Sequence, residues 1–170
     1  MPQLIPDPVD FTVLGATASP AQTAALGVRV AGLLSGGEAL FLWGPLGAGK
    51  TLFVQGLCRG LGVTDEVVSP TYNLACRYRG RLTVHHLDFY RVGPGADLAD
   101  IGVDGMLEDL DAGDAILVAE WPLPLVPHVT RRLELLVLPG AGAEERLWFA
   151  RGAPQLPPAW RTLLAKAPPC

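Results

Sequence analysis

The stretch that decides the fold reads Gly44-Pro45-Leu46-Gly47-Ala48-Gly49-Lys50-Thr51. Its fixed positions match the pattern GxxxxGK[ST], in which glycines let the backbone wrap so that successive N–H groups point at phosphate oxygens. The apolar run ALFLW at residues 39–43 comes directly before it and predicts a strand buried on both faces. A helix is predicted from Lys50 to about residue 59, and its N-terminus adds the positive end of the helix dipole. The stretch therefore predicts a phosphate-binding loop between a buried strand and a helix.

The loop also carries two side chains with defined chemistry. Lys50 is expected to reach the β- and γ-phosphates of a nucleoside triphosphate, and the Thr51 hydroxyl is expected to ligate Mg²⁺. The chain lacks an NKxD-type guanine-recognition motif, which favours ATP as the nucleotide. The expected nucleotide-binding residues of the loop are Gly44, Pro45, Leu46, Gly47, Ala48, Gly49, Lys50, Thr51 and Leu52.

Helical and strand patterns alternate along the rest of the chain, and no internal repeat or domain boundary interrupts them. We expect a single domain over residues 1–170, with loose proline-rich tails at 1–10 and about 153–170. The other predicted elements are a helix over 20–34, a β-hairpin of 72–79 and 82–89 around Gly80-Arg81, short helices over 96–111, a buried strand over 115–121 and an antiparallel strand pair over 131–138 and 145–152.

Composition restricts the class of protein further. The 170 residues are 49% hydrophobic and 18% charged, with a net charge of −4, which predicts a globular chain without a positive field for nucleic acid. Cys58, Cys76 and Cys170 are widely spaced and form no CxxC pair, which argues against a zinc site and a disulfide framework. The sequence shows neither a signal peptide nor a membrane-spanning run, so we expect a cytoplasmic protein.

Hydrolysis of a nucleotide needs a carboxylate near the metal and a group that places a water molecule. Glu120 ends the apolar strand AILVAE, and the C-terminal edge of a parallel sheet is where ligands bind in open α/β folds. Asp88 ends the second strand of the predicted hairpin, on one face with His86 and Tyr90. Spacing alone leaves this face equally compatible with a polar site and with a solvated sheet surface.

Two further segments have both an ordinary and a functional interpretation. Ser69-Pro70-Thr71 lies where P-loop proteins place a switch segment that senses the γ-phosphate, although an isolated proline turn has the same pattern. Trp121 follows Glu120 directly, so it is either a core residue or a lid over the nucleotide.

Four motifs in this order resemble one family. The segments LGAGKT at the loop, Ser69-Pro70-Thr71-Tyr72, His86-x-Asp88-x-Tyr90-Arg91 and Glu120-Trp121 are similar to those of the TsaE family, the small ATPase of bacterial tRNA threonylcarbamoyladenosine synthesis. The resemblance covers roughly residues 20–150. The loop motif is shared by many families, whereas the other three segments at these separations are much more specific.

The resemblance implies an α/β fold, a P-loop NTPase-like three-layer sandwich with a mixed parallel and antiparallel sheet. It implies ATP and Mg²⁺ as cofactors, and a partner complex that transfers threonylcarbamoyl to the adenosine beside the anticodon of tRNAs. The ATPase would serve turnover of this transferase, with tRNA contacted indirectly. The resemblance also implies roles for individual residues. These are Lys50 and Thr51 at the phosphates and metal, Asp88 and Glu120 at the metal and water, Thr71 in the switch segment, Trp121 beside the nucleotide and Thr23 near the adenine.

The chain also departs from the family pattern. Pro45 stands where an acid or Asn is usual, and it removes one backbone donor at a variable position. Leu52 and Asn73 stand where the family commonly has threonine, which puts fine control of the hydrolysis rate in question. Two other functions stay open: a small-molecule P-loop kinase, with the arginines of residues 77–81 as a lid, and a nucleotide-gated interaction module with little hydrolysis.

Overall fold

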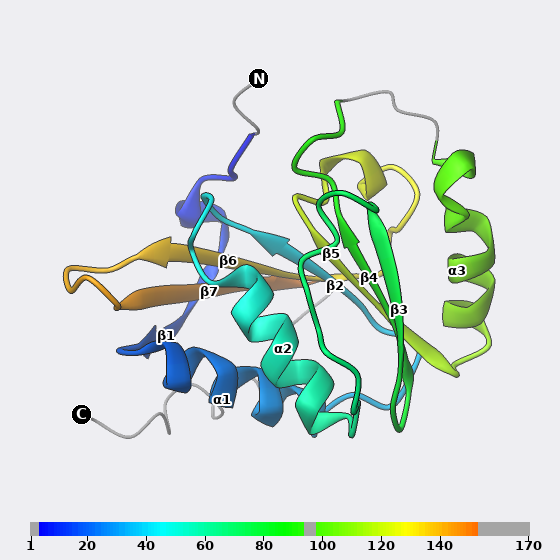
Figure 1. Cartoon of the computed structure of the whole chain (residues 1–170). Coiled ribbons are helices and arrows are strands. Elements are labelled where there is room, and N and C mark those ends of the chain that lie inside the picture. The colour runs from blue at the N-terminus through cyan, green and yellow to red at the C-terminus, as the bar shows by residue number, and fades with distance from the viewer. Residues whose placement is uncertain (1–3, 94–97, 153–170) are drawn as a thin grey trace.

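A seven-stranded mixed sheet forms the middle of the molecule (Figure 1). The computed structural model describes residues 4–93 and 98–152, and the strand order in the sheet is β1-β7-β6-β2-β5-β4-β3. Strands β6, β2, β5 and β4 are parallel, whereas β3 and β7 run against their neighbours. The strands are β1 (Thr12–Thr17), β2 (Ala39–Trp43), β3 (Ala75–Arg79), β4 (Thr83–Asp88), β5 (Ala115–Glu120), β6 (Leu133–Pro139) and β7 (Arg146–Gly152).

Helices cover both faces of this sheet. Helices α1 (Pro20–Ala31) and α2 (Lys50–Gly60) lie together on one face, and α3 (Val103–Asp111) lies on the other (Figure 1). Three 3₁₀ turns, η1 (Pro8–Asp10), η2 (Ala99–Ile101) and η3 (Leu123–Leu125), complete the described elements. The three layers confirm the predicted P-loop NTPase-like α/β sandwich with a mixed sheet. In the part of the chain that the structure describes, no helix is long and apolar enough to cross a membrane.

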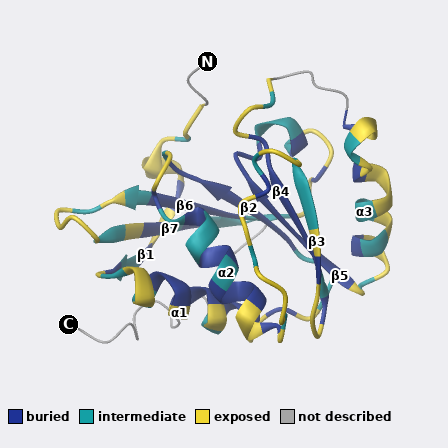
Figure 2. Ribbon diagram, viewed as in Figure 1, coloured by how far each residue is buried: buried dark blue, intermediate teal, exposed yellow. Residues whose placement is uncertain are grey.

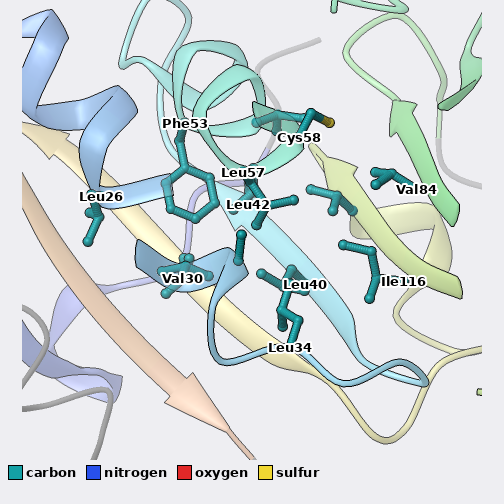
Figure 3. Packing of buried hydrophobic residues seen from close by; sticks show 14 of the residues in the cluster. Leu26, Val30, Leu34, Leu40, Leu42, Phe53, Leu57, Cys58, Val84 and Ile116 are labelled. Carbon is teal, nitrogen blue, oxygen red and sulfur yellow. The ribbon is translucent and has the colours of Figure 1, made fainter. Parts of the chain in front are cut away.

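The larger core lies between the sheet and the helix pair α1 and α2. The strands at the centre are buried, while each helix has one buried and one exposed side (Figure 2). Phe53 and Leu57 of α2 and Val30 of α1 pack over Leu40 and Leu42 of β2 (Figure 3). Each of these side chains is at most 1% exposed, and full burial of one such side chain stabilises the fold by about 1.5–3 kcal/mol. This packing fixes α2 against the strand that precedes its loop.

The two helices of this layer approach each other backbone to backbone. A Cβ atom on Gly56 would lie 1.9 Å from the carbonyl oxygen of Ala24, and one on Gly27 would lie 2.2 Å from the carbonyl oxygen of Phe53. Any larger residue at either position would push the helices apart. Because α2 begins at Lys50, this contact also sets the position of the phosphate-binding loop.

Most predicted elements are present, with shifted ends. Strand β2, helix α2, the hairpin of β3 and β4, strand β5 and the pair of β6 and β7 are confirmed. The helix predicted over 20–34 begins as expected, with Ser19 accepting a hydrogen bond from the N–H of Gln22 (3.2 Å) and Pro20 at its first position. It ends at Ala31, three residues before the predicted end at residue 34. Strand β3 begins only at Ala75, since residues 71–73 form a turn.

Strand β1 is not predicted by the sequence pattern. It is an edge strand whose pairing with β7 shifts between Val13 and Gly15, and such a bulge interrupts the alternation on which strand prediction rests. The expected loose start of the chain contains the turn η1. Residues 1–3, residues 96–97 of the predicted helical segment and the expected tail at 153–170 lie outside the described residues.

Candidate functional site

Three parallel strands end at the same edge of the sheet and bring the predicted site residues together. In the pairing of β4 with β5, Asp88 lies opposite Glu120, and in the pairing of β2 with β5, Leu42 lies opposite Glu120. The loop from Gly44 follows β2 directly, so it begins beside both carboxylates. This is the edge where open α/β sheets bind ligands.

The loop itself is shaped to present backbone N–H groups. Gly49 adopts φ 98° and precedes the first residue of α2, and no side chain caps that helix end. The first N–H groups of a helix have no intrahelical acceptor, so an uncapped start next to a glycine loop suits an anion. Behind the loop, the Arg146 Nε donates to the Ala48 carbonyl (3.1 Å).

Lys50 is enclosed by the loop and by Trp121. Its Nζ donates to the carbonyls of Gly44 and Pro45, at 2.9 Å each, and lies 4.1 Å from the centroid of the Trp121 ring. The residue is only 4% exposed. Burial lowers the pKa of Lys50 to about 8, while Glu120 and then Asp88 act in the opposite direction. The ammonium therefore loses its charge unusually close to neutral pH.

Trp121 has a backbone conformation that bulky residues rarely adopt. Its φ is 54°, in the left-handed region that is unfavourable for a large side chain. The ring is 6% exposed, packs 5.1 Å from the Tyr90 ring and covers the Lys50 ammonium. Such strain is concentrated at functional sites. Trp121 is thus buried like a core residue while it faces the loop.

The carboxylate of Glu120 joins the loop to β4. Its Oε1 accepts hydrogen bonds from the Thr51 hydroxyl (2.8 Å) and pairs with Nε2 of His86 (3.1 Å). Glu120 is 3% exposed and His86 is fully buried. His85, the neighbour of His86, points to the opposite face and pairs with Asp109 (2.9 Å), as strand alternation predicts.

Asp88 holds the segment that contains the predicted switch residues. Its Oδ2 accepts hydrogen bonds from the hydroxyls of Ser69 (3.0 Å) and Thr71. Its Oδ1 accepts one from the N–H of Tyr90 (2.9 Å). The structure therefore resolves the ambiguity of this face: Asp88 belongs to a polar cluster and is only 3% exposed.

These residues surround one cavity of about 450 Å³, within the size range of small-molecule sites. Three of the predicted residues, Thr23, Gly44 and Pro45, do not line the cavity. The Thr23 hydroxyl shares a hydrogen bond with that of Thr17 (2.9 Å), and its methyl group lies 3.6 Å from the position of a Cβ atom on Gly49. The role of Thr23 near an adenine stays a prediction. Gly44 and Pro45 contribute their carbonyls to Lys50 rather than a lining surface. The predicted residues that line the cavity are Leu46, Gly47, Ala48, Gly49, Lys50, Thr51, Leu52, Thr71, Asp88, Glu120 and Trp121.

Four further residues line the cavity, Ser69, Tyr72, Tyr90 and Arg91, none of which was among the predicted site residues. They lie within the same motifs as Thr71 and Asp88, so the motifs themselves were the available signal. Arg146, which contacts the loop from β7, has no sequence signal of this kind.

The oxygen atoms at the sheet edge suit a hard divalent cation. Thr51, Glu120 and Asp88 offer one hydroxyl and two carboxylates, which are the ligand types that Mg²⁺ prefers. Within residues 4–93 and 98–152, no group of three or more His, Cys, Asp or Glu side chains is placed to hold a metal alone. Mg²⁺ in proteins is usually bound by one or two carboxylates together with water and substrate phosphates.

Comparisons with known proteins agree on one family. The family model described as threonylcarbamoyl adenosine biosynthesis protein TsaE matches residues 17–142. The chain is similar to the tRNA threonylcarbamoyladenosine biosynthesis protein TsaE of Treponema pallidum, with 39% identity over 72% of this chain and 90% of that protein. It is 33% identical to the protein of the same name from Bacillus subtilis, over 76% of this chain and 79% of that one.

A solved structure has a similar fold. The crystal structure of YdiB from Bacillus subtilis superimposes with a TM-score of 0.67 and 28% sequence identity, covering 84% of this chain and 88% of that chain.

Proposed function

This chain belongs to the TsaE family, and on that premise we propose that it is a Mg²⁺-dependent ATPase that supports threonylcarbamoyladenosine formation in tRNA. The relatives are named for this biosynthesis. The hydrolytic activity is proposed from the chemistry of the site.

One observation carries the proposal: a phosphate-binding loop and two acidic side chains share one cavity. Thr51 of the loop donates to Glu120, and Glu120 lies opposite Asp88 in the sheet. The backbone of the loop and Lys50 would bind the phosphates, and Thr51, Glu120 and Asp88 would hold Mg²⁺. When bound, Mg²⁺ neutralises charge on the β- and γ-phosphates and on the leaving group.

In the proposed reaction, water cleaves the terminal phosphate from ATP. The oxygen of a water molecule bonds to the γ-phosphorus as the bond between that phosphorus and the β–γ bridging oxygen breaks, and the water releases one proton, which gives ADP, inorganic phosphate and H⁺. Asp88 and Glu120 are the buried carboxylates that can orient this water. Trp121 covers the Lys50 ammonium and excludes solvent from it, which strengthens its attraction to phosphate.

The partner in this proposal is the threonylcarbamoyl transferase complex. The net charge of −4 favours a protein partner over direct binding to the tRNA backbone. We expect slow hydrolysis by the chain alone and stimulation by the complex, as in P-loop proteins that receive a catalytic group from a partner.

The arginines at the hairpin tip give little support to a kinase lid. Arg77 pairs with Asp109 (3.5 Å), and Arg81 donates to the carbonyls of Ala31 (3.0 Å) and Leu34 (3.1 Å). Both are thus directed away from the cavity. An interaction module with little hydrolysis uses the same binding residues, so only an activity measurement distinguishes it.

The test is isothermal titration of the purified chain with ATP and Mg²⁺, with Lys50→Ala as the comparison. We expect saturable binding that Lys50→Ala weakens at least about tenfold, the loss of one charge-assisted contact. Equal binding by both proteins, or none by the wild type, would remove the basis of the proposal.

A further inference from the structure

Two pairs of a cation and an aromatic ring line the nucleotide cavity. The Lys50 pair with Trp121 is buried beside the loop. In the other pair, the Arg91 guanidinium lies 4.5 Å from the centroid of the Tyr72 ring. Tyr72 is 81% exposed, so this pair stands at the solvent side of the cavity, where both residues form part of the lining.

The Arg91 guanidinium has no acidic partner in residues 4–93 and 98–152. The charged residues that line the cavity are two cations, Lys50 and Arg91, and two carboxylates, Asp88 and Glu120. Lys50 interacts electrostatically with both carboxylates. Arg91 therefore keeps its donors available for an anion that enters the cavity.

Both members of the exposed pair are fixed to Asp88 through adjacent residues. Tyr72 follows Thr71, whose hydroxyl donates to Asp88, and Arg91 follows Tyr90, whose N–H donates to Asp88. Asp88 lies beside Glu120, the partner of Thr51. Tyr72 and Arg91 thus each follow directly on a residue that is hydrogen-bonded to Asp88, at the sheet edge where Asp88 and Glu120 lie.

We propose that Arg91 is a ligand of the terminal phosphate of the bound nucleotide, and that Tyr72 positions its guanidinium for this contact. The inference rests on the proposed nucleotide-binding function. An arginine can stack one face on an aromatic ring while its edge donates two parallel hydrogen bonds to a phosphate. A lysine presents a single compact charge and cannot do both.

The contact predicts that Arg91 distinguishes ATP from ADP. The experiment titrates ATP and ADP, each with Mg²⁺, into the wild type, Arg91→Ala and Arg91→Lys. The matched control is Arg79→Ala, which removes the same charge from an exposed position on β3 outside the cavity. We expect Arg91→Ala to weaken ATP binding about 10- to 100-fold with no change for ADP, Arg91→Lys to recover only part of the loss, and Arg79→Ala to match the wild type.

Tyr72 is tested as a positioning residue by two variants. Tyr72→Leu removes the aromatic face, and we expect a selective loss of ATP affinity that is smaller than that of Arg91→Ala. Tyr72→Phe retains the face and should recover most of the affinity. A loss that followed the phenol hydroxyl instead would contradict the positioning role.

The outcomes separate this inference from the proposed function. If the wild type and Arg91→Ala bind ATP equally well, the contact between Arg91 and the terminal phosphate is refuted. This holds even if Arg91→Ala is no longer stimulated by a partner complex. An equal loss of ATP and ADP affinity in a variant that unfolds at the wild-type temperature would refute it too. Failure of the wild type to bind either nucleotide would overturn the proposed function together with this inference.

Discussion

Raising the pH from 7 to 9 should weaken ATP binding through one residue, Lys50. Burial against the loop and Trp121 lowers the pKa of Lys50 to about 8 from 10.5, whereas the phosphates of a bound nucleotide favour the ammonium. Above pH 8 the free protein has lost the proton that the complex needs, so binding must take up a proton.

The size of the effect follows from this pKa. With a single group of pKa about 8, the apparent affinity should be about twofold lower at pH 8 and about tenfold lower at pH 9 than at pH 7. Proton uptake per ATP should rise from about 0.1 at pH 7 to about 0.8 at pH 8.5. Cys58 and Tyr78, whose pKa values burial raises to about 12, stay protonated throughout this window.

The assay is isothermal titration at each pH in two buffers of different ionisation enthalpy, from which the proton uptake is obtained directly. Uptake that stays near zero from pH 7 to 9 would refute the reasoning about Lys50.

The stability of the free protein should increase with pH, whereas its affinity for ATP decreases. Between pH 8 and 10.5 the unfolded chain binds the extra proton, so the Lys50 contribution to the unfolding free energy rises by up to about 3 kcal/mol.

Three further predictions concern the fold. Gly56→Ala should destabilise the protein by about 1–3 kcal/mol because the added methyl overlaps the α1 backbone, whereas Gly105→Ala in α3, where the methyl meets no neighbour, should stabilise it by up to about 1 kcal/mol; thermal melts that ranked the two in reverse would contradict the close helix contact. Cys58 is buried with a pKa of about 12, so peptide mass spectrometry after iodoacetamide treatment at pH 8 should find it unmodified in the folded protein and modified in urea; rapid native labelling would be inconsistent with this burial. Glu134→Ala should lower the unfolding free energy by about 3 kcal/mol in urea titrations, because the buried carboxylate accepts from Trp43 and two arginines, while the exposed Glu144→Ala should change little; equal effects would exclude a special role for this cluster.

Local sequence patterns predict much of the site because many of its residues lie in contiguous segments. The loop from Gly44 to Thr51 and the strand that ends at Glu120 each carry their own signal, in glycine spacing and in an unbroken apolar run. Asp88 was ambiguous because alternation gives a face but not its neighbours. The structure places the hydroxyls of Ser69 and Thr71 against it.

The rest depends on contacts between distant parts of the chain. The sheet places β2 between β5 and β6, and the hydrophobic periodicity of a single segment cannot show this order. Tyr72 and Arg91 meet only because the turn before β3 returns to the end of β4. The backbone strain at Trp121 likewise comes from the packing around it, since the residue type alone disfavours that conformation.

We propose that the cavity hydrolyses ATP for a threonylcarbamoyl transferase complex. The most direct measurement is release of inorganic phosphate from ATP with Mg²⁺, by the chain alone and with that complex, using Glu120→Ala as control. We predict slow hydrolysis alone, a rise when the complex is added and loss of that rise in Glu120→Ala. ATP binding without phosphate release in any mixture, or release that Glu120→Ala leaves unchanged, would contradict the account.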